Sequence, residues 1–250
     1  MRARRRFKYW LIADLDGTFL GGPAESQERL NALFGADERD IGLVYCSGRS
    51  LAKIYPSVRA GKLPVPSAII GDVGTGLWDS RGQALSSQFD ELVARRWAGA
   101  QSRVLPQLRA LEGLQLQTGT GPYRCSFVYS KRRTAELAAQ RVRKLELDAL
   151  ISGGCYFDVL PRNVNKGFAV RYLLELWRLD PEKVLVAGDT LNDLSMLSLS
   201  GKELGVHALA VGNADPELRS HFAVNDRAVY SDGHGAAGIW ERLEQLGWVH

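Results

Sequence analysis

Short apolar runs, each flanked by turn residues, alternate with stretches of helical periodicity along much of this 250-residue chain. Val170–Trp177 carries apolar residues at i, i+3, i+4 and i+7, and Ile239–Leu246 shows a similar stripe, so both predict amphipathic helices. Continuous apolar runs are typical of strands buried on both faces. The alternation therefore predicts an α/β fold, a parallel sheet covered by helices. The expected strands are Tyr9–Ala13, Gly42–Cys46, Ser67–Ile70, Lys183–Ala187 and His207–Val211.

The middle of the chain follows a different pattern, in which strands pair with their neighbours and helices are grouped. The expected elements are a hairpin at Gly76–Ser87, a helix at about Glu91–Leu111, a strand at Arg124–Tyr129, a helix at about Thr134–Leu147, and paired strands at Ala149–Ile151 and Tyr156–Leu160. This succession predicts an α+β module inserted into the α/β core. The predicted division is core at residues 1–79, inserted module at 80–160 and core again at 161–250.

The charge of the chain indicates no polyanionic partner. The net charge is +4 and the sequence pI is about 9.0. The basic excess comes from a terminal cluster, Arg2, Arg4, Arg5, Arg6 and Lys8. A solvated tail is the favoured interpretation of such an arm, and a nucleic-acid partner is not expected.

No membrane span is expected either, because the apolar stretch Tyr9–Ala13 is too short for one. The cysteines, Cys46, Cys125 and Cys155, are odd in number and widely spaced, without a zinc-site pattern. This usage argues for a reducing compartment, so a cytoplasmic protein is predicted.

Two carboxylates, Asp14 and Asp16, stand one residue apart where the first apolar run ends. Desolvating an unpaired carboxylate costs several kcal/mol, so a pair at a buried strand end needs a cation, a proton or many hydrogen bonds. Side chains at i and i+2 point to the same side of a strand, so the two can converge. The pair indicates a divalent metal site, or a nucleophile beside a proton-transfer group. An ordinary Asp-Gly turn would explain Asp16 but not Asp14.

Two further segments offer groups that suit an anion. Ser47 and Gly48 follow the strand at Gly42–Cys46 and can present a hydroxyl and backbone N–H groups near a helix start. A plain Ser/Gly helix start explains that segment equally well. Lys166 opens a predicted helix, where its charge opposes the macrodipole and is better placed for an anionic ligand.

A second acidic pair, Asp189 and Asp193, follows the apolar run Lys183–Ala187. In open parallel sheets ligands bind beyond the carboxyl ends of the strands, so both acidic pairs are expected at one edge. Their oxygens suit one Mg²⁺ ion, which keeps positions for water and substrate phosphate. The alternative is that Asn192 and Asp193 only cap the next helix.

Together these segments resemble the four motifs of the haloacid dehalogenase superfamily of phosphotransferases. The motifs are Asp14-Leu-Asp16-Gly-Thr18, Ser47, Lys166 and Gly188-Asp189-(x)2-Asn192-Asp193. The insert lies where the type IIB branch carries its α/β cap. Further segments look like sucrose-phosphate phosphatases and related disaccharide-phosphate phosphatases, such as mannosylfructose-phosphate phosphatases. They are Val73-Gly74-Thr75, Phe157–Pro161 leading into Asn165-Lys166-Gly167, Gly212–Ala214 and His234–Ile239.

The resemblance implies hydrolysis of a sugar phosphate, most readily a disaccharide or glycoside phosphate, through an aspartyl-phosphate. Asp14 would be the nucleophile and Asp16 the general acid and base. The implied phosphate-binding residues are Ser47, Gly48, Lys166 and Asn192. The implied Mg²⁺ ligands are Asp14, the backbone carbonyl of Asp16, and Asp189, with Asp193 behind them.

The cap would determine the substrate, and its residues depart from the resemblance. Gly76 stands where related phosphatases carry Glu, and Cys155-Tyr156 stands where they carry Lys-Asp. Both changes remove polar groups that could bind sugar hydroxyls, so the preferred sugar is expected to differ. The candidate sugar contacts, on the resemblance alone, are Thr75, Tyr123, Arg124, Tyr156, Asp158 and Arg162.

Three alternatives remain open from the sequence. A glycosyl-3-phosphoglycerate phosphatase, or another sugar-phosphate phosphatase, is a direct competitor. A phosphomutase of the same superfamily would differ by its need for a bisphosphate activator. A sugar-phosphate sensor without catalysis would be expected to have lost Asp14 or Asp16, and both are present.

Overall fold

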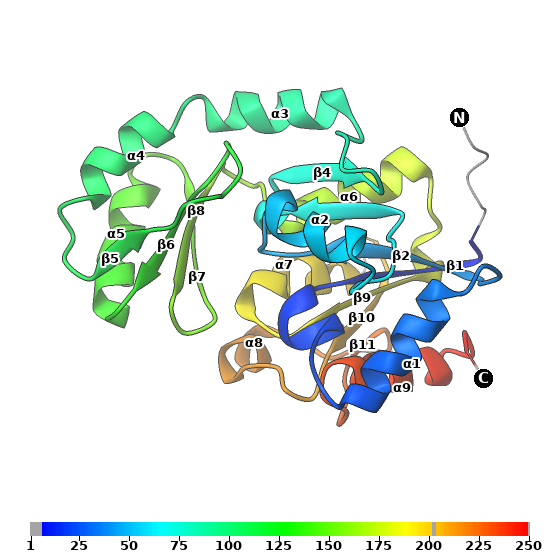
Figure 1. Cartoon of the computed structure of the whole chain (residues 1–250). Helices are drawn as coiled ribbons and strands as arrows, with labels where there is room; N and C mark the ends of the chain where they lie inside the picture. The colour runs from blue at the N-terminus through cyan, green and yellow to red at the C-terminus, as the bar shows by residue number, and fades with distance from the viewer. Residues whose placement is uncertain (1–6, 202–203, 250) are drawn as a thin grey trace.

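The computed structural model describes residues 7–201 and 204–249, so the arginines at positions 2, 4, 5 and 6 lie outside it. Its core is a seven-stranded sheet in the order β11-β10-β9-β1-β2-β3-β4 (Figure 1). Every neighbouring pair is parallel except β3 and β4. The strands are β1 Tyr9–Ala13, β2 Ile41–Cys46, β3 Ala68–Gly71, β4 Gly76–Asp79, β9 Val184–Gly188, β10 His207–Ala210 and β11 Ala228–Tyr230. The predicted parallel sheet is confirmed, and each predicted core strand ends within one residue of the observed one.

Helices cover both faces of the core sheet, which explains its continuous apolar runs. Strand residues such as Ile12 and Val44 pack with residues of α3, α6, α7 and α8 on one face. Leu11 and Leu43 pack with α1, α2 and α9 on the other. These helices are α1 Ala24–Gly35, α2 Leu51–Arg59, α3 Ser87–Trp97, α6 Lys166–Trp177, α7 Leu194–Leu197, α8 Pro216–His221 and α9 Ala236–Gln245.

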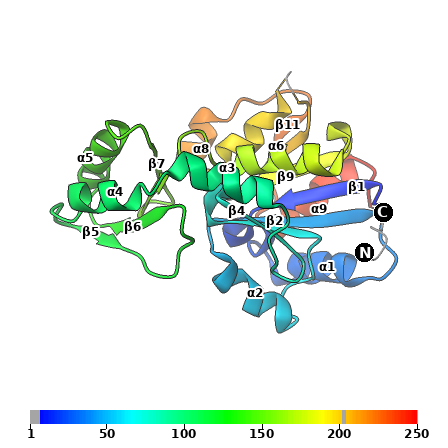
Figure 2. The same ribbon diagram turned by 90° about the horizontal axis from the view of Figure 1, so that it is seen from above.

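A second sheet, of four antiparallel strands in the order β5-β6-β8-β7, forms the inserted module. Its strands are β5 Leu114–Leu116, β6 Cys125–Tyr129, β7 Asp148–Ser152 and β8 Tyr156–Leu160, and its helices are α4 Gln101–Leu108 and α5 Arg132–Arg143. In two perpendicular views this sheet lies to one side of the core, with α3 running between them (Figures 1 and 2). Its own apolar core runs from Trp97 to Val159, whereas Phe89 and Val93 of α3 pack against the core sheet.

Three predicted elements of the module need correction. The helix expected at Glu91–Leu111 is two helices, because Ala98 and Gly99 adopt φ of +46° and +66°, which a right-handed helix cannot contain. The helix expected at Thr134–Leu147 begins two residues earlier and ends at Arg143. The hairpin expected at Gly76–Ser87 is reduced to β4 and a single bridge between Trp78 and Ala84.

Over residues 7–201 and 204–249, no helix combines the length and apolar character needed to cross a membrane.

Candidate active site

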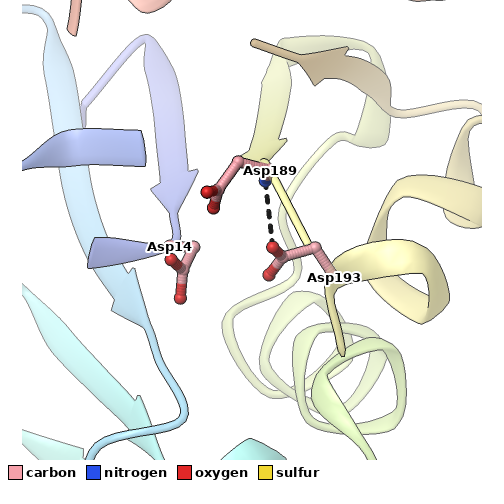
Figure 3. Close-up of side chains that lie close together, drawn as sticks. All are labelled: Asp14, Asp189 and Asp193. Carbon is pink, nitrogen blue, oxygen red and sulfur yellow. Dashed lines mark hydrogen bonds between the residues drawn. The ribbon is translucent and has the colours of Figure 1, made fainter. Parts of the chain in front are cut away.

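The parallel pairing of β1 with β9 brings two acidic segments together. Ala13 lies opposite Ala187 in the sheet, and the backbone N–H of Asp14 donates to Ala187 O at 3.0 Å. Asp14 and Asp189 therefore leave neighbouring strands at the same edge. Their carboxylates meet that of Asp193, and one oxygen of each lies within 4.8 Å of the others (Figure 3).

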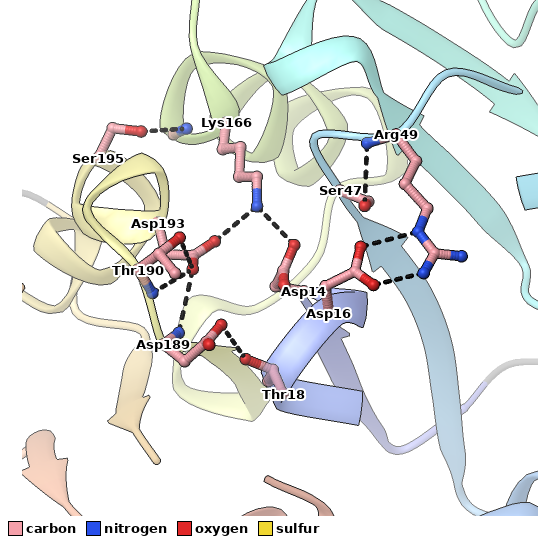
Figure 4. Close-up of polar contacts among 11 residues, drawn as sticks. Asp14, Asp16, Thr18, Ser47, Arg49, Lys166, Asp189, Thr190, Asp193 and Ser195 are labelled. Carbon is pink, nitrogen blue, oxygen red and sulfur yellow. Dashed lines mark hydrogen bonds and ion pairs between the residues drawn. The ribbon is translucent and has the colours of Figure 1, made fainter. Parts of the chain in front are cut away.

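Lys166 is the cation of this cluster and is fully buried. It is the first residue of α6, whose N-cap Asn165 accepts a hydrogen bond from Phe168 N at 3.0 Å. From there its Nζ donates to Asp14 Oδ1 at 2.7 Å and to Asp193 Oδ1 at 2.6 Å (Figure 4). The contact leaves Asp14 Oδ2 outside this ion pair.

Asp193 has both oxygens engaged. Its Oδ2 accepts hydrogen bonds from the backbone N–H groups of Asp189 and Thr190, each at 3.0 Å, while Oδ1 receives Lys166. The turn that it organises closes tightly, since a Cβ on Gly188 would lie 2.4 Å from Asp193 Cβ. Asp193 therefore positions Lys166 and the Asp189 loop, and it has less freedom to bind a metal directly than Asp14 and Asp189 have.

Two carboxyl groups of the cluster, those of Asp14 and Asp189, bind protons unusually strongly. Burial raises the pKa of Asp14 to about 7, with Asp193 adding to the shift and Lys166 opposing it. Burial also raises the pKa of Asp189 to about 8, with further contributions from Asp193 and Asp14. Burial alone would lower the pKa of Lys166, but Asp14 and Asp193 outweigh it and raise that pKa. One lysine does not neutralise the three carboxylates.

This imbalance fits a divalent cation at Asp14 and Asp189. A bound cation would favour the ionised form of both groups, and an all-oxygen donor set suits a hard ion. Gly17 makes room beside Asp189, because with φ of +79° its backbone approaches so closely that a Cβ there would lie 2.1 Å from Asp189 Oδ2. Thr18 donates its hydroxyl to Asp189 Oδ1 at 2.9 Å and fixes that carboxylate.

Asp16 lies on the open side of the site, with 58% of its side chain exposed. Arg49 holds it with two donors, Nε on Oδ2 at 2.7 Å and Nη2 on Oδ1 (Figure 4). The backbone N–H of Arg49 also donates to Ser47 Oγ at 3.1 Å, and Ser47 is buried. Arg49 thus connects the predicted proton-transfer group to the predicted phosphate-binding hydroxyl.

A cavity of about 330 Å³ lies between the core and the inserted module at this point. Seven of the residues singled out from the sequence line it, namely Asp14, Asp16, Gly48, Arg124, Tyr156, Asp158 and Asn192. The side-chain oxygen of Asn192 is buried and has no hydrogen-bond partner within the described residues. The cavity therefore joins the acidic cluster to the polar face of the module.

Three predicted sugar contacts do not line this cavity. Thr75 is buried and donates its hydroxyl to Asp72 O at 3.0 Å. Tyr123 packs against apolar residues of both the core and the module. Arg162 is largely exposed and lies 4.0 Å from Glu146. Local hydrogen bonding engages Thr75, packing holds Tyr123, and Arg162 lies at the surface beside Glu146.

Several residues that line the cavity or hold its walls had no role assigned from the sequence. Arg49 could have been suspected, since it follows Ser47 and Gly48 directly. Ser126 and Ser152 are single serines in apolar strands, and only the register of the second sheet brings them to one face. Asp72 carries no motif signal, yet it is buried and pairs with Arg124 at 3.3 Å.

The parallel core, the inserted α+β module and the Asp14–Lys166–Asp189–Asp193 cluster define a haloacid dehalogenase-type hydrolase fold. The family model described as Sucrose-6F-phosphate phosphohydrolase matches residues 7–247, and the chain belongs to that family.

Similar proteins agree with this placement. Glucosylglycerol-phosphate synthase from Pseudomonas anguilliseptica is 35% identical over 96% of this chain and 31% of its own length. Sucrose-phosphatase 2 from Nicotiana tabacum is 28% identical over 93% of this chain and 58% of its own length. The chain thus spans 31% and 58% of the length of these two relatives. The structure of the sucrose-phosphatase from Synechocystis sp. PCC6803, in complex with sucrose and phosphate, has a TM-score of 0.83 at 23% identity, covering 96% of this chain and 98% of that one.

Proposed function

We propose that this chain hydrolyses the phosphate monoester of a disaccharide or glycoside, with Asp14 as the nucleophile. The observation that carries the proposal is the position of Asp14 between Lys166 and Asp189, at the end of a cavity that the inserted module covers. Lys166 binds Oδ1 and leaves Oδ2 for attack. A carboxylate held between a cation and a metal site is suited to forming a covalent phosphoryl intermediate.

Two displacements at phosphorus follow from this arrangement. Asp14 Oδ2 forms a bond to phosphorus while the ester P–O bond breaks, and the departing oxygen takes a proton from Asp16. Asp16 then accepts a proton from water, whose oxygen bonds to phosphorus as the bond to Asp14 breaks. Inorganic phosphate leaves and Asp14 is restored. The exposed position of Asp16 beside the cavity suits both transfers.

The remaining motif residues hold the phosphoryl group. Lys166, Ser47, Asn192 and the backbone of Gly48 would bind its oxygens and offset the charge that develops on them. Asp14, Asp189 and the backbone carbonyl of Asp16 would hold Mg²⁺, with Asp193 fixing this arrangement from behind. When bound, Mg²⁺ shields the repulsion between the Asp14 carboxylate and the phosphate dianion.

The substrate class rests on the relatives and on the cavity. Relatives are named for sucrose phosphate and for glucosylglycerol phosphate, both glycosides with one phosphoryl group. The module at residues 80–160 supplies the polar wall of the cavity opposite Asp14, so we assign it the choice of leaving group.

All three cysteines are free, which supports the cytoplasmic localisation that the sequence predicts.

The test is phosphate release with Mg²⁺ from a panel of disaccharide, glycoside and hexose phosphates, by the wild type and by Asp14→Asn. We expect the variant to lose all turnover and to stay folded, with a thermal unfolding midpoint no lower than that of the wild type. Asp37→Asn, an exposed site on the core, is the matched control. Unchanged turnover in Asp14→Asn would exclude Asp14 as the nucleophile. Activity that requires an added sugar bisphosphate would identify a phosphomutase instead.

A further inference from the structure

The second sheet has two chemically different faces. Along β6, Cys125, Phe127 and Tyr129 point into the apolar core of the module, beneath α4 and α5. The side chains between them point the opposite way, because successive residues of a strand alternate. Ser126 is therefore on the other face, which lines the cavity above Asp14.

Strand register gathers further polar groups on that face. Ser126 of β6 is opposite Asp158 of β8, and Tyr156 of β8 is opposite Ser152 of β7. Gln117 follows β5 and is tied to β6 by a hydrogen bond from its N–H to Ser126 O at 2.8 Å. All five side chains line the same cavity.

Three of these side chains, Ser126, Ser152 and Asp158, keep hydrogen-bonding capacity that the chain itself does not use. As whole residues Ser126 and Ser152 are 3% and 2% exposed, and within the described residues their hydroxyls make no hydrogen bond and open onto the cavity. Asp158 Oδ1 is also buried and accepts no hydrogen bond there. Polar groups in closed sites of folded proteins normally have hydrogen-bond partners, so these groups are available to a ligand that enters the cavity. Hydroxyl groups of a ligand can both donate to Asp158 and exchange hydrogen bonds with the serines.

The two arginines near this face are already paired with carboxylates. Arg124 has 5% of its side chain exposed and lies between two carboxylates, with Nε 3.3 Å from Asp72 Oδ1 and Nη1 3.5 Å from Asp158 Oδ1. Arg49 is occupied by Asp16. Lys53 is exposed, so water and salt weaken its attraction for an anion. A carboxylate placed on this face would meet Asp158 without a free buried cation to balance it.

We propose that the cavity face formed by Gln117, Ser126, Ser152, Tyr156 and Asp158 binds an uncharged, polyhydroxylated leaving group, and that the buried Asp72–Arg124–Asp158 trio excludes leaving groups that carry a carboxylate. This inference rests on the proposed phosphatase function. It names the substrate class more narrowly, since it separates neutral glycoside phosphates from glycosyl-phosphoglycerates.

The decisive comparison uses two substrates that differ in one group. Glucosylglycerol phosphate carries a hydroxymethyl group where glucosyl-phosphoglycerate carries a carboxylate. We expect kcat/KM with Mg²⁺ to be about 100-fold higher for the neutral substrate, because an unpaired charge in a buried polar site is strongly disfavoured. Equal values, or a preference for the acidic substrate, would overturn the inference.

Two variants test the charge trio. Asp158→Asn and Asp72→Asn each remove one carboxylate beside Arg124, so the guanidinium becomes available to an anion. Each variant is expected to lower the ratio of kcat/KM for the neutral substrate to kcat/KM for the acidic substrate about tenfold, partly by raising kcat/KM on the acidic substrate. If the trio had a purely structural role, each variant would lower kcat/KM on the neutral and on the acidic substrate by the same factor. An unchanged ratio of the two kcat/KM values would therefore count against the proposal. Using both variants, one in the module and one in the core, guards against a failure to fold.

Two serine variants test the hydroxyl-binding face. Ser126→Ala and Ser152→Ala are each expected to lower kcat/KM on glucosylglycerol phosphate by about tenfold. Ser130→Ala, an exposed serine just beyond β6, is the matched control and should be unchanged. If both serine variants kept the wild-type kcat/KM on glucosylglycerol phosphate, the assignment of this face would be refuted. Lack of activity on every phosphate ester would instead be a failure of the proposed function, so the two failures are distinguishable.

Discussion

Replacing Lys166 by methionine should reveal the charge imbalance of the acidic cluster. Methionine keeps most of the volume of the buried side chain, so the packing cost should stay below about 1.5 kcal/mol. The electrostatic cost is larger, because Asp14 and Asp193 lose the cation that lies 2.7 Å and 2.6 Å from them. Removing one partner of a buried ion pair costs about 3–5 kcal/mol. For a chain of this size, that loss corresponds to a fall of about 6–20 °C in the unfolding midpoint.

Mg²⁺ should restore part of this stability. With Lys166 absent, the carboxylates attract a divalent cation more strongly, and a ligand that binds only the folded chain stabilises it by mass action. The assay is thermal unfolding of wild type and Lys166→Met at neutral pH, with EDTA and with a Mg²⁺ series. We expect a larger Mg²⁺-dependent rise in the variant than in the wild type.

A surface lysine supplies the control for this experiment. Lys183 has 53% of its side chain exposed and pairs with Asp180 at 3.5 Å, so Lys183→Met should cost under about 1 kcal/mol and be indifferent to Mg²⁺. If Lys166→Met behaved like Lys183→Met, the reasoning about the buried cluster would be refuted.

Three further predictions concern the same site. In metal-free protein, Asp14 and Asp189 bind protons more tightly in the folded chain than in the unfolded one. The unfolding midpoint should therefore fall as pH rises from about 4 to about 8, and Mg²⁺ should reduce that fall. A midpoint that rises over this range in EDTA would contradict the raised pKa values. Gly17→Ala should lose about 100-fold in kcat/KM because its Cβ would collide with Asp189. The control is Gly99→Ala, which is also at positive φ but has nothing within 4 Å and should keep its activity. Equal kcat/KM for the two variants would refute the close approach of Gly17 to Asp189. Arg49→Lys cannot hold both oxygens of Asp16 and should lower kcat about tenfold. Arg59→Lys, at the end of the helix α2 that follows Arg49, should leave kcat unchanged. Wild-type kcat in Arg49→Lys would show that the pairing is unnecessary.

The core and its catalytic edge could be predicted from the sequence because their signals are local. Continuous apolar runs identified β1 and β9, and the charges that end those runs identified Asp14 and Asp189. Parallel pairing then requires these residues to meet. That β9 lies next to β1 is an observation of the structure.

The inserted module was less predictable because its chemistry depends on register and on single backbone conformations. The break between α3 and α4 depends on the left-handed conformation of Ala98, which alanine does not signal. Ser126 and Ser152 face the cavity only because of how β6, β7 and β8 are paired. Asp72 and Arg124 are 52 positions apart in the sequence, and only the fold makes them a buried ion pair.

The central claim is that Asp14 becomes phosphorylated during turnover. Its most direct test is mass spectrometry of enzyme mixed with glucosylglycerol phosphate or sucrose phosphate and Mg²⁺, quenched in acid within a single turnover and digested. The mechanism predicts one phosphoryl group on the peptide that contains Asp14, and none in Asp14→Asn. A phosphoryl group on another residue, or active enzyme that never carries one, would contradict it.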